Sequence, residues 1–109
     1  MPDYILVFVT TASAQEAEQL GKTLVEKRLA ACGNIVQDIR SIFWWKDAIE
    51  NEQEALLILK SRAVLFPTII DVVRSLHSYE VPEIIAIPII SGSKDYLNWI
   101  DQETQKEQE

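Results

Sequence analysis

The sequence predicts an α+β fold in which helices cover an antiparallel sheet. Short runs rich in β-branched and aromatic residues alternate with stretches whose apolar residues recur at helical spacing. Their order along residues 1–109 is strand, helix, strand, strand, helix, strand, helix. The first six segments have the βαββαβ order of the ferredoxin-like fold, and the seventh is an extra C-terminal helix. A chain of 109 residues suits a single domain.

The N-terminal third predicts a strand followed by a helix. Tyr4–Val9 is almost continuously apolar, as expected of a strand that is buried on both faces. Ser13 and Glu16 have the spacing of a capping box, which places the start of a helix that runs to about Ala31. Gly21 lies on the apolar side of this helix, which predicts that the helix approaches the sheet closely there.

A long β-hairpin is predicted in the middle of the chain. The extended segment 33–45 is followed by a polar tip at Lys46–Gln53 and by a returning strand at Glu54–Lys60. Neighbouring residues of a strand point to opposite faces, so Trp44 and Trp45 are expected to pack on different surfaces. One is expected to contact the core and the other a neighbouring subunit, because Trp is enriched at binding hot spots. Stacking on a ligand is the alternative.

The C-terminal half predicts a helix, a strand and a last helix. Apolar residues recur at helical spacing over Ala63–His77, and a strand follows at Glu83–Ile90. Pro88 cannot donate a hydrogen bond to a neighbouring strand, so this strand is expected at an edge of the sheet or bent there. Ser93 is expected to cap the last helix, and the polar segment Asp101–Glu109 is expected to fray. The buried stripe of the last helix is expected to consist of Tyr96, Leu97 and Ile100.

The strands also predict that the chain assembles into an oligomer. The first, third and fourth expected strands are apolar on both faces instead of alternating. Two or three helices cannot cover both faces of a four-stranded sheet. The second face is therefore expected to be buried by another subunit in an obligate oligomer.

Charge and composition exclude several classes of partner. The net charge of −7 and the lack of a basic stripe argue against nucleic acid, which binds proteins through Lys and Arg. The longest apolar runs are far shorter than the about 20 residues that span a bilayer, and no signal peptide is recognisable, so no membrane partner is expected. A single cysteine cannot form an intrachain disulfide, which favours the cytoplasm.

The first candidate for a chemical site is the stretch 76–83, which holds the single histidine, a tyrosine and two glutamates. His77 is expected at a helix end, where it either bonds carbonyl groups or binds a metal ion or a small anion. Cys32 is expected to be a small buried hydrophobe, with a thiolate ligand that faces another subunit as the alternative. One Cys, one His and one Met cannot form a closed four-ligand zinc site, so a metal ion would need carboxylates or several subunits.

A pocket for a small ligand is predicted from aromatic, acidic and basic residues. Tyr and Trp side chains beside a carboxylate suit such a pocket, and a hydrogen-bonded seam between subunits is the alternative. Lys60 is expected either as a charge at the end of a strand or as a partner of Glu80 or of an anion. The Glu50–Glu54 cluster is expected to be a solvated surface that binds hard cations weakly. The residues expected to converge with His77 at a subunit boundary are Tyr79, Glu80, Glu83, Tyr96 and Trp99, and Lys60 is assigned to the same cleft.

Several segments spread along nearly the whole chain occur together in one known protein family. They are Glu26-Lys27-Arg28-Leu29-Ala30-Ala31-Cys32, Asn34-Ile35, Ser41-Ile42-Phe43-Trp44-Trp45-Lys46, Leu57-Ile58-Leu59-Lys60, His77-Ser78-Tyr79-Glu80-Val81-Pro82-Glu83 and Asp95-Tyr96-Leu97-Asn98-Trp99-Ile100. In this combination and order they resemble the CutA family of divalent-cation tolerance proteins.

The resemblance implies a ferredoxin-like subunit in a tight homotrimer like that of the PII signalling proteins, with the sheets facing the threefold axis. It also implies a cytoplasmic role in tolerance of copper or other divalent cations, and it defines no molecular activity. Some members have a metal-ligating cysteine late in the first strand, where this chain has Val9, and a second histidine, where it has Leu76. These departures weaken a copper site, and Ser78 and Asp47-Ala48 also replace the usual Pro and Gly-Lys.

Three functions are compatible with the sequence. The first is a non-enzymatic trimer that responds to Cu²⁺ or another divalent cation, has no organic cofactor, and binds the ion or a small ligand in clefts between subunits. The second is an enzyme that acts on a small metabolite in the same clefts, with Glu80 or His77 as general base. No nucleophile–base pair, phosphate loop or cofactor fingerprint supports this function. The third is a trimeric scaffold whose hairpin tips dock a partner protein.

Overall fold

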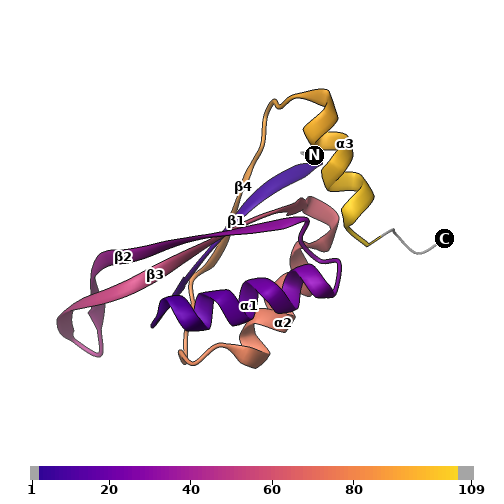
Figure 1. The fold of residues 1–109 in the computed structure, drawn as a ribbon. Coiled ribbons are helices and arrows are strands. Elements are labelled where there is room, and N and C mark those ends of the chain that lie inside the picture. The colour runs from indigo at the N-terminus through magenta and orange to yellow at the C-terminus, as the bar shows by residue number, and fades with distance from the viewer. Residues whose placement is uncertain (1–2, 106–109) are drawn as a thin grey trace.

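The computed structural model describes residues 3–105, which form a four-stranded antiparallel sheet with helices (Figure 1). The strand order is β2-β3-β1-β4, so the two outer strands come from the middle and the end of the chain. This arrangement confirms the α+β, ferredoxin-like fold with a long hairpin and an additional C-terminal helix. The elements are β1 (Tyr4–Thr11), α1 (Ala14–Glu26), β2 (Cys32–Trp45), β3 (Ala48–Arg62), a 3₁₀ turn (Ala63–Leu65), α2 (Phe66–Leu76), β4 (Ile84–Pro88) and α3 (Lys94–Glu103).

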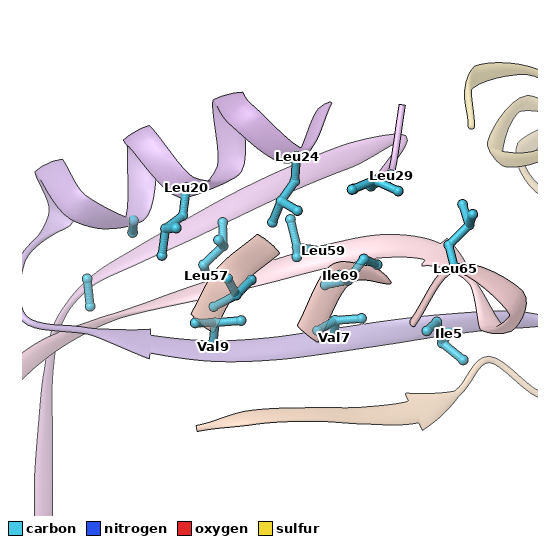
Figure 2. Close-up of a cluster of buried hydrophobic side chains, with 14 residues drawn as sticks. Ile5, Val7, Val9, Leu20, Leu24, Leu29, Leu57, Leu59, Leu65 and Ile69 are labelled. Atoms are coloured by element: carbon cyan, nitrogen blue, oxygen red, sulfur yellow. The ribbon is translucent and has the colours of Figure 1, made fainter. Parts of the chain in front are cut away.

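The hydrophobic core lies between one face of the sheet and the helices α1 and α2. These two helices run along the same face, whereas α3 lies at the end of the sheet where β1 begins (Figure 1). Figure 2 shows that strand residues with odd numbers point toward these helices. The fully buried side chains of this layer include Val7, Val9, Leu24, Leu57, Leu59 and Ile69.

The opposite face of the sheet carries large apolar side chains that no helix covers. Leu6 and Phe8 of β1 are only half-buried, and the neighbouring strand β4 exposes 51% of Ile85 and 45% of Ile87. The register pairs Phe8 with both Ile58 and Ile85, so these side chains share one face. The prediction of strands that are apolar on both faces, with helices on only one of them, is confirmed.

Helix α1 ends five residues earlier than predicted. It stops at Glu26 because Arg28 adopts a left-handed conformation with φ of 63°. The backbone N–H of Leu29 then donates to the carbonyl of Leu24, and the N–H of Arg28 donates to that of Val25. This is a Schellman motif, which glycine usually signals. Because this position holds an arginine and not a glycine, the end of the helix could not be predicted from the sequence.

The hairpin is longer, and its turn shorter, than predicted. The prediction of a polar tip at Lys46–Gln53 is wrong, because β3 already begins at Ala48. Only Lys46 and Asp47 form the turn, and both have positive φ, as in the two-residue turns that match the twist of a hairpin. The outer part of β3 carries polar residues on both of its faces, so it lacks the apolar pattern that would have predicted a strand there. A bulge between Val36 and Ile39 interrupts the pairing of β2 with β3.

Two predictions about backbone packing are confirmed. A Cβ atom at Gly21 would lie 3.1 Å from Leu57 Cδ1, so the glycine allows α1 to approach the sheet closely. Pro88 ends β4, which is an edge strand. Both β4 and α2 are shorter than expected, and α2 follows the 3₁₀ turn and begins at Phe66.

The predicted fraying of the C-terminal segment is wrong for residues 101–105. The Tyr4 hydroxyl donates to Asp101 Oδ2 at 2.6 Å, and Thr104 is buried. The backbone N–H of Gln105 donates to the carbonyl of Arg28 at 2.7 Å. These bonds fasten α3 to β1 and to the end of α1, and residues 106–109 lie outside the described part of the chain.

The core can be tested with two adjacent positions on α1. Replacing the fully buried Leu24 by alanine should lower the free energy of unfolding by about 2–5 kcal/mol, because it leaves a cavity. Replacing the partly exposed Val25 by alanine should cost less than about 1 kcal/mol. Chemical denaturation measures both values, and equal losses would contradict the assignment of the buried face.

Candidate functional site

One candidate site is centred on a buried carboxylate at the base of the hairpin. Glu54 lies on β3 and is only 6% exposed. The Tyr79 hydroxyl, from the segment after α2, donates a hydrogen bond to Glu54 Oε2. Burial and then this hydrogen bond raise the pKa of the Tyr79 phenol well above its usual value. Tyr79 therefore stays protonated and acts as a donor to the carboxylate.

Both ring nitrogens of His77 bond to backbone groups, and Nδ1 also lies 3.7 Å from Glu16 Oε2. His77 caps α2, and its side chain is fully buried. Nδ1 accepts a hydrogen bond from the backbone N–H of Tyr79 at 3.0 Å, so the ring proton is assigned to Nε2, which donates to the carbonyl of Thr10 at 2.7 Å. The expected bond to a carbonyl is present, but the carbonyl belongs to β1 and not to the last turn of the helix. The assignment of His77 as a metal ligand stays a prediction, and binding would displace one of these backbone partners.

Glu16 joins the start of α1 to the segment after α2. Its carboxylate accepts hydrogen bonds from Ser78 N at 2.8 Å, from Ser78 Oγ at 3.0 Å and from Ala12 N at 3.1 Å. Burial disfavours the charged form, but these bonds outweigh it and hold the pKa of Glu16 below its usual value. The predicted capping box is half formed, because Ser13 caps the N–H of Glu16 while Glu16 binds Ala12 and not Ser13.

A second group of candidate residues surrounds the thiol of Cys32. Cys32 is paired with Lys60 on the face of the sheet that no helix covers, and its side chain is half-buried. Its Sγ lies 4.0 Å from Lys60 Nζ and 3.7 Å from Asn34 Oδ1, and Lys60 Nζ also donates to Asn34 Oδ1. The prediction of Cys32 as a small buried hydrophobe is therefore wrong, since the thiol has polar partners. Its assignment as a metal ligand stays a prediction.

The aromatic residues of α3 belong to this second group. The Tyr96 and Trp99 rings lie 5.4 Å apart between their centroids. Burial and then the nearby Cys32 thiol raise the pKa of Tyr96. Tyr96 is nevertheless 41% exposed, so its prediction as part of a buried stripe is wrong, whereas Ile100 is buried as expected.

The predicted site residues do not converge within one chain. Lys60 and Glu54 are six residues apart on β3, which separates the two groups by about 20 Å. Tyr79, Glu80 and Glu83 lie near Glu54, whereas Tyr96 and Trp99 lie at the end near Lys60. The expected pairing of Lys60 with Glu80 is absent for the same reason.

A groove of about 1040 Å³ lies between the hairpin and the segment 78–83. Both Trp44 and Trp45 line it, although neighbouring residues of a strand point to opposite faces. Trp44 is 72% exposed, so it does not pack on the core of its own subunit. The lining residues are Thr10, Ala12, Ser41, Ile42, Phe43, Trp44, Trp45, Glu50, Glu52, Gln53, Glu54, Ser78, Tyr79, Glu80, Val81 and Glu83.

The sequence missed the role of the glutamates on β3. They were expected to form a solvated surface, but Glu54 is buried and Glu50 and Glu52 line the groove with it. Glu50, Glu52 and Glu54 occur at every second residue, and this spacing could have predicted that they lie on one face of a strand. Within residues 3–105 of one chain, no three His, Cys, Asp or Glu side chains are grouped closely enough to hold a metal ion. The same part of the chain has no helix that is long and apolar enough to cross a membrane.

Residues 5–103 match the family described as CutA1 divalent ion tolerance protein. The chain belongs to this family. It is 43% identical to the mouse protein CutA over a stretch of 98 residues. This stretch makes up 90% of this chain but only 55% of the mouse protein. It is 42% identical to the divalent-cation tolerance protein CutA of Thermus thermophilus, over 91% of this chain and 96% of that protein.

A solved structure agrees with this assignment. The CutA structure from Archaeoglobus fulgidus superimposes with a TM-score of 0.91 at 43% identity and covers 94% of this chain and 99% of that one. That relative is described as a periplasmic divalent cation tolerance protein. The family is thus named for cation tolerance and not for a reaction. The chain spans about half the length of the mouse relative.

The Tyr79–Glu54 bond can be tested by removing one hydroxyl group. Replacing Tyr79 by phenylalanine should lower the free energy of unfolding by about 1–3 kcal/mol, because it leaves the buried Glu54 carboxylate without its donor. Replacing the exposed Tyr96 by phenylalanine should change it by less than about 0.5 kcal/mol. Urea denaturation of the two variants measures the difference, and an equal effect would contradict this role of Tyr79.

Glu16 predicts a dependence of stability on pH. Its pKa is lower in the folded state than the value of 4.5 expected in the unfolded chain, so ionised Glu16 stabilises the fold at neutral pH. This contribution should be lost as the pH falls from about 4.5 through the lower pKa of the folded state. Urea denaturation should show that Glu16→Gln destabilises the protein at pH 7 and that the difference from the wild type shrinks toward pH 3. Glu18→Gln, at an exposed position of the same helix, is the control. A difference that stays constant with pH would contradict the role of the Glu16 charge.

Proposed function

We propose that this protein acts in tolerance of divalent cations as a cytoplasmic, non-enzymatic homotrimer that binds cations in clefts between its subunits. The observation that supports it best is the charge of the groove. Five glutamates line this groove, and no Lys, Arg or His from the described part of the chain is among its lining residues. Carboxylate oxygens are the ligands preferred by hard divalent cations. Membership of a family named for divalent-ion tolerance agrees with this role.

The uncovered face of the sheet supports the homotrimer. Phe8, Ile85 and Ile87 form part of an apolar surface that continues along β3 to the groove. A closed ring of three copies joins two different surfaces of each subunit. The groove and the Lys60 end of the sheet are two such surfaces, the first lined by carboxylates and the second carrying the Lys60 ammonium group. In a ring they would meet, and the acidic and aromatic residues separated within one chain would face each other across the boundary.

The charges favour a cleft of carboxylates over a thiol–imidazole site for the divalent cation, Cu²⁺ included. Both nitrogens of His77 already bind backbone groups, and an ammonium group lies near Cys32. A neighbouring subunit would supply the further oxygen ligands that one chain lacks. The alternative function, an enzyme with His77 or Glu80 as general base, has less support. Both ring nitrogens of His77 are already bonded, and Glu80 is exposed.

A scaffold function has one observation in its favour. The outer part of the hairpin exposes three large apolar side chains, since Ile42, Trp44 and Ile49 are each more than half exposed. Clusters of exposed apolar side chains of this kind often mark surfaces that bind another protein. A partner that docks at the hairpin tip is therefore the second candidate function.

The oligomer can be tested with two positions of equal exposure. Ile85→Lys places a charge on the uncovered sheet face, and Val64→Lys places one on the turn before α2; both residues are 51% exposed in a single chain. Sedimentation should show a trimer for the wild type and for Val64→Lys, and smaller species for Ile85→Lys. The proposed interface is wrong if both variants remain trimers or if the wild type is a monomer.

The metal function can be tested by calorimetry on protein stripped of metal with a chelator. Replacing Glu52 by glutamine should weaken binding of Cu²⁺ or another divalent cation, because it removes a carboxylate of the groove. Replacing His77 by alanine should weaken binding less than Glu52→Gln does, because it loosens the wall of the groove without removing a ligand, and circular dichroism checks that the protein stays folded. A larger loss in His77→Ala than in Glu52→Gln would identify the histidine as the ligand and contradict the carboxylate cleft.

A further inference from the structure

The segment 78–83, which forms one wall of the groove, is held in place by hydrogen bonds from its backbone. It has no helix or strand of its own. The backbone N–H of Tyr79 donates to His77 Nδ1 at 3.0 Å, and the backbone N–H of Ser78 donates to Glu16 Oε2 at 2.8 Å. Both acceptors belong to side chains that can gain a proton, so these two bonds depend on pH.

The bond from Tyr79 requires a neutral imidazole ring. Nε2 of His77 carries the ring proton and donates to the carbonyl of Thr10 at 2.7 Å, which leaves Nδ1 as an acceptor. Imidazole is the side chain that ordinarily gains a second proton between about pH 8 and about pH 5. That proton would bind Nδ1, because Nε2 already has one. Two N–H groups would then face each other with their nitrogens 3.0 Å apart, and the bond from Tyr79 would be lost.

A carboxylate is placed to pair with the charged ring. Glu16 Oε2 lies 3.7 Å from His77 Nδ1. Burial opposes the charge of Glu16, but its hydrogen bonds to Ser78 and Ala12, together with the His77 charge, hold its pKa below the usual value. Glu16 is therefore ionised in the pH range in which an imidazole gains its proton. Because Oε2 also accepts from the backbone N–H of Ser78, a charged ring that attracts this oxygen would weaken both backbone bonds of the segment.

Glu16 is the carboxylate within ion-pair distance of the ring in the described part of the chain. Two further carboxylates accept hydrogen bonds from side chains next to the ring, since Glu54 bonds to Tyr79 and Glu83 bonds to Thr10. Strand β1 presents an uncharged residue, Thr10, to the ring. The charged and titratable side chains that face the ring or its partners are Glu16 from α1, Glu54 from β3, Tyr79 and Glu83 from the segment after α2, and Arg74 from the last turn of α2.

We propose that His77 is a proton-operated switch that controls the segment 78–83. With a neutral ring it holds the backbone of Tyr79, and with a charged ring it pairs with Glu16 and releases the backbone of Ser78 and Tyr79. The released segment would loosen one wall of the groove, and with it the cleft between subunits, at mildly acidic pH. Only this last consequence rests on the proposed function, because the switch itself needs no bound cation.

NMR of the full-length assembled protein from about pH 8 to about pH 5 tests this inference. The chain has one histidine, so the imidazole signals report the charge of this ring alone. Solvent exchange of the Tyr79 amide, relative to its intrinsic rate, measures the bond to Nδ1. Its protection should fall about fivefold or more as the ring gains its proton, which corresponds to the loss of one hydrogen bond. The amide of Leu59, a fully buried residue in the centre of the sheet, should keep its protection.

Two variants separate the switch from a purely structural role of His77. His77→Gln keeps a side chain that can donate and accept but does not titrate, so the protection of the Tyr79 amide should be equal at both ends of the pH range. Glu16→Gln removes the partner of the charged ring, so the ring should gain its proton at lower pH than in the wild type. Glu18→Gln, at an exposed position of the same helix, should leave the titration of the ring unchanged.

The inference is overturned by a ring that stays neutral down to about pH 5, or by one that gains its proton while the Tyr79 amide keeps its protection. It is also overturned by an equal loss of protection in His77→Gln, or by a parallel loss at Leu59, which would mean that the whole sheet loosens. Sedimentation of the same samples separates this outcome from that of the proposed oligomer. Release of the segment in a monomer would support the switch and contradict the trimer, and a trimer that releases nothing would do the reverse.

Discussion

The alternation of side chains along β3 is the constraint on which the rest of the structure depends. This strand pairs with both β1 and β2, so its register fixes the faces of three strands at once. The odd-numbered Leu57 and Leu59 are buried beneath the helices, and the even-numbered Leu56 and Ile58 lie on the uncovered face. The same even parity places Glu54, farther along the strand, on the groove. A slip of one residue would exchange all of these faces, which is why the apolar pattern fixes the register so firmly.

The hairpin and the end of α2 form the groove through a small number of polar contacts. Tyr79 binds Glu54, and His77 binds the carbonyl of Thr10. Glu16 holds Ser78 from the other side. Each partner comes from a different element, so the segment 78–83 is positioned by hydrogen bonds and not by a helix or strand of its own. The residue that seemed most reactive in the sequence, the single histidine, therefore serves in this structure to hold the wall of the groove.

Much of the fold could be predicted from sequence because its signals are local. Caps such as Ser13 and Ser93, the glycine at position 21 and the edge proline Pro88 each act on their immediate surroundings. The errors arose where a local signal was missing. Arg28 ends a helix without a glycine, and polar residues conceal the outer half of β3. The candidate site was harder to predict, because Glu54 and Tyr79 are 25 residues apart and nothing nearby in the sequence shows that they meet.

The sequence by itself determined the order of the elements, the apolar character of both sheet faces and the residue types that a site can use. These follow from periodicity and composition, which each segment carries alone. Only the tertiary structure decided which of the candidate residues stand together. It separated Lys60, Tyr96 and Trp99 from Tyr79 and Glu80 by the length of a strand, and it brought Glu54 into the site. The physical reason is that strand register and helix packing set distances between residues far apart in the chain, and these distances depend on the whole sheet.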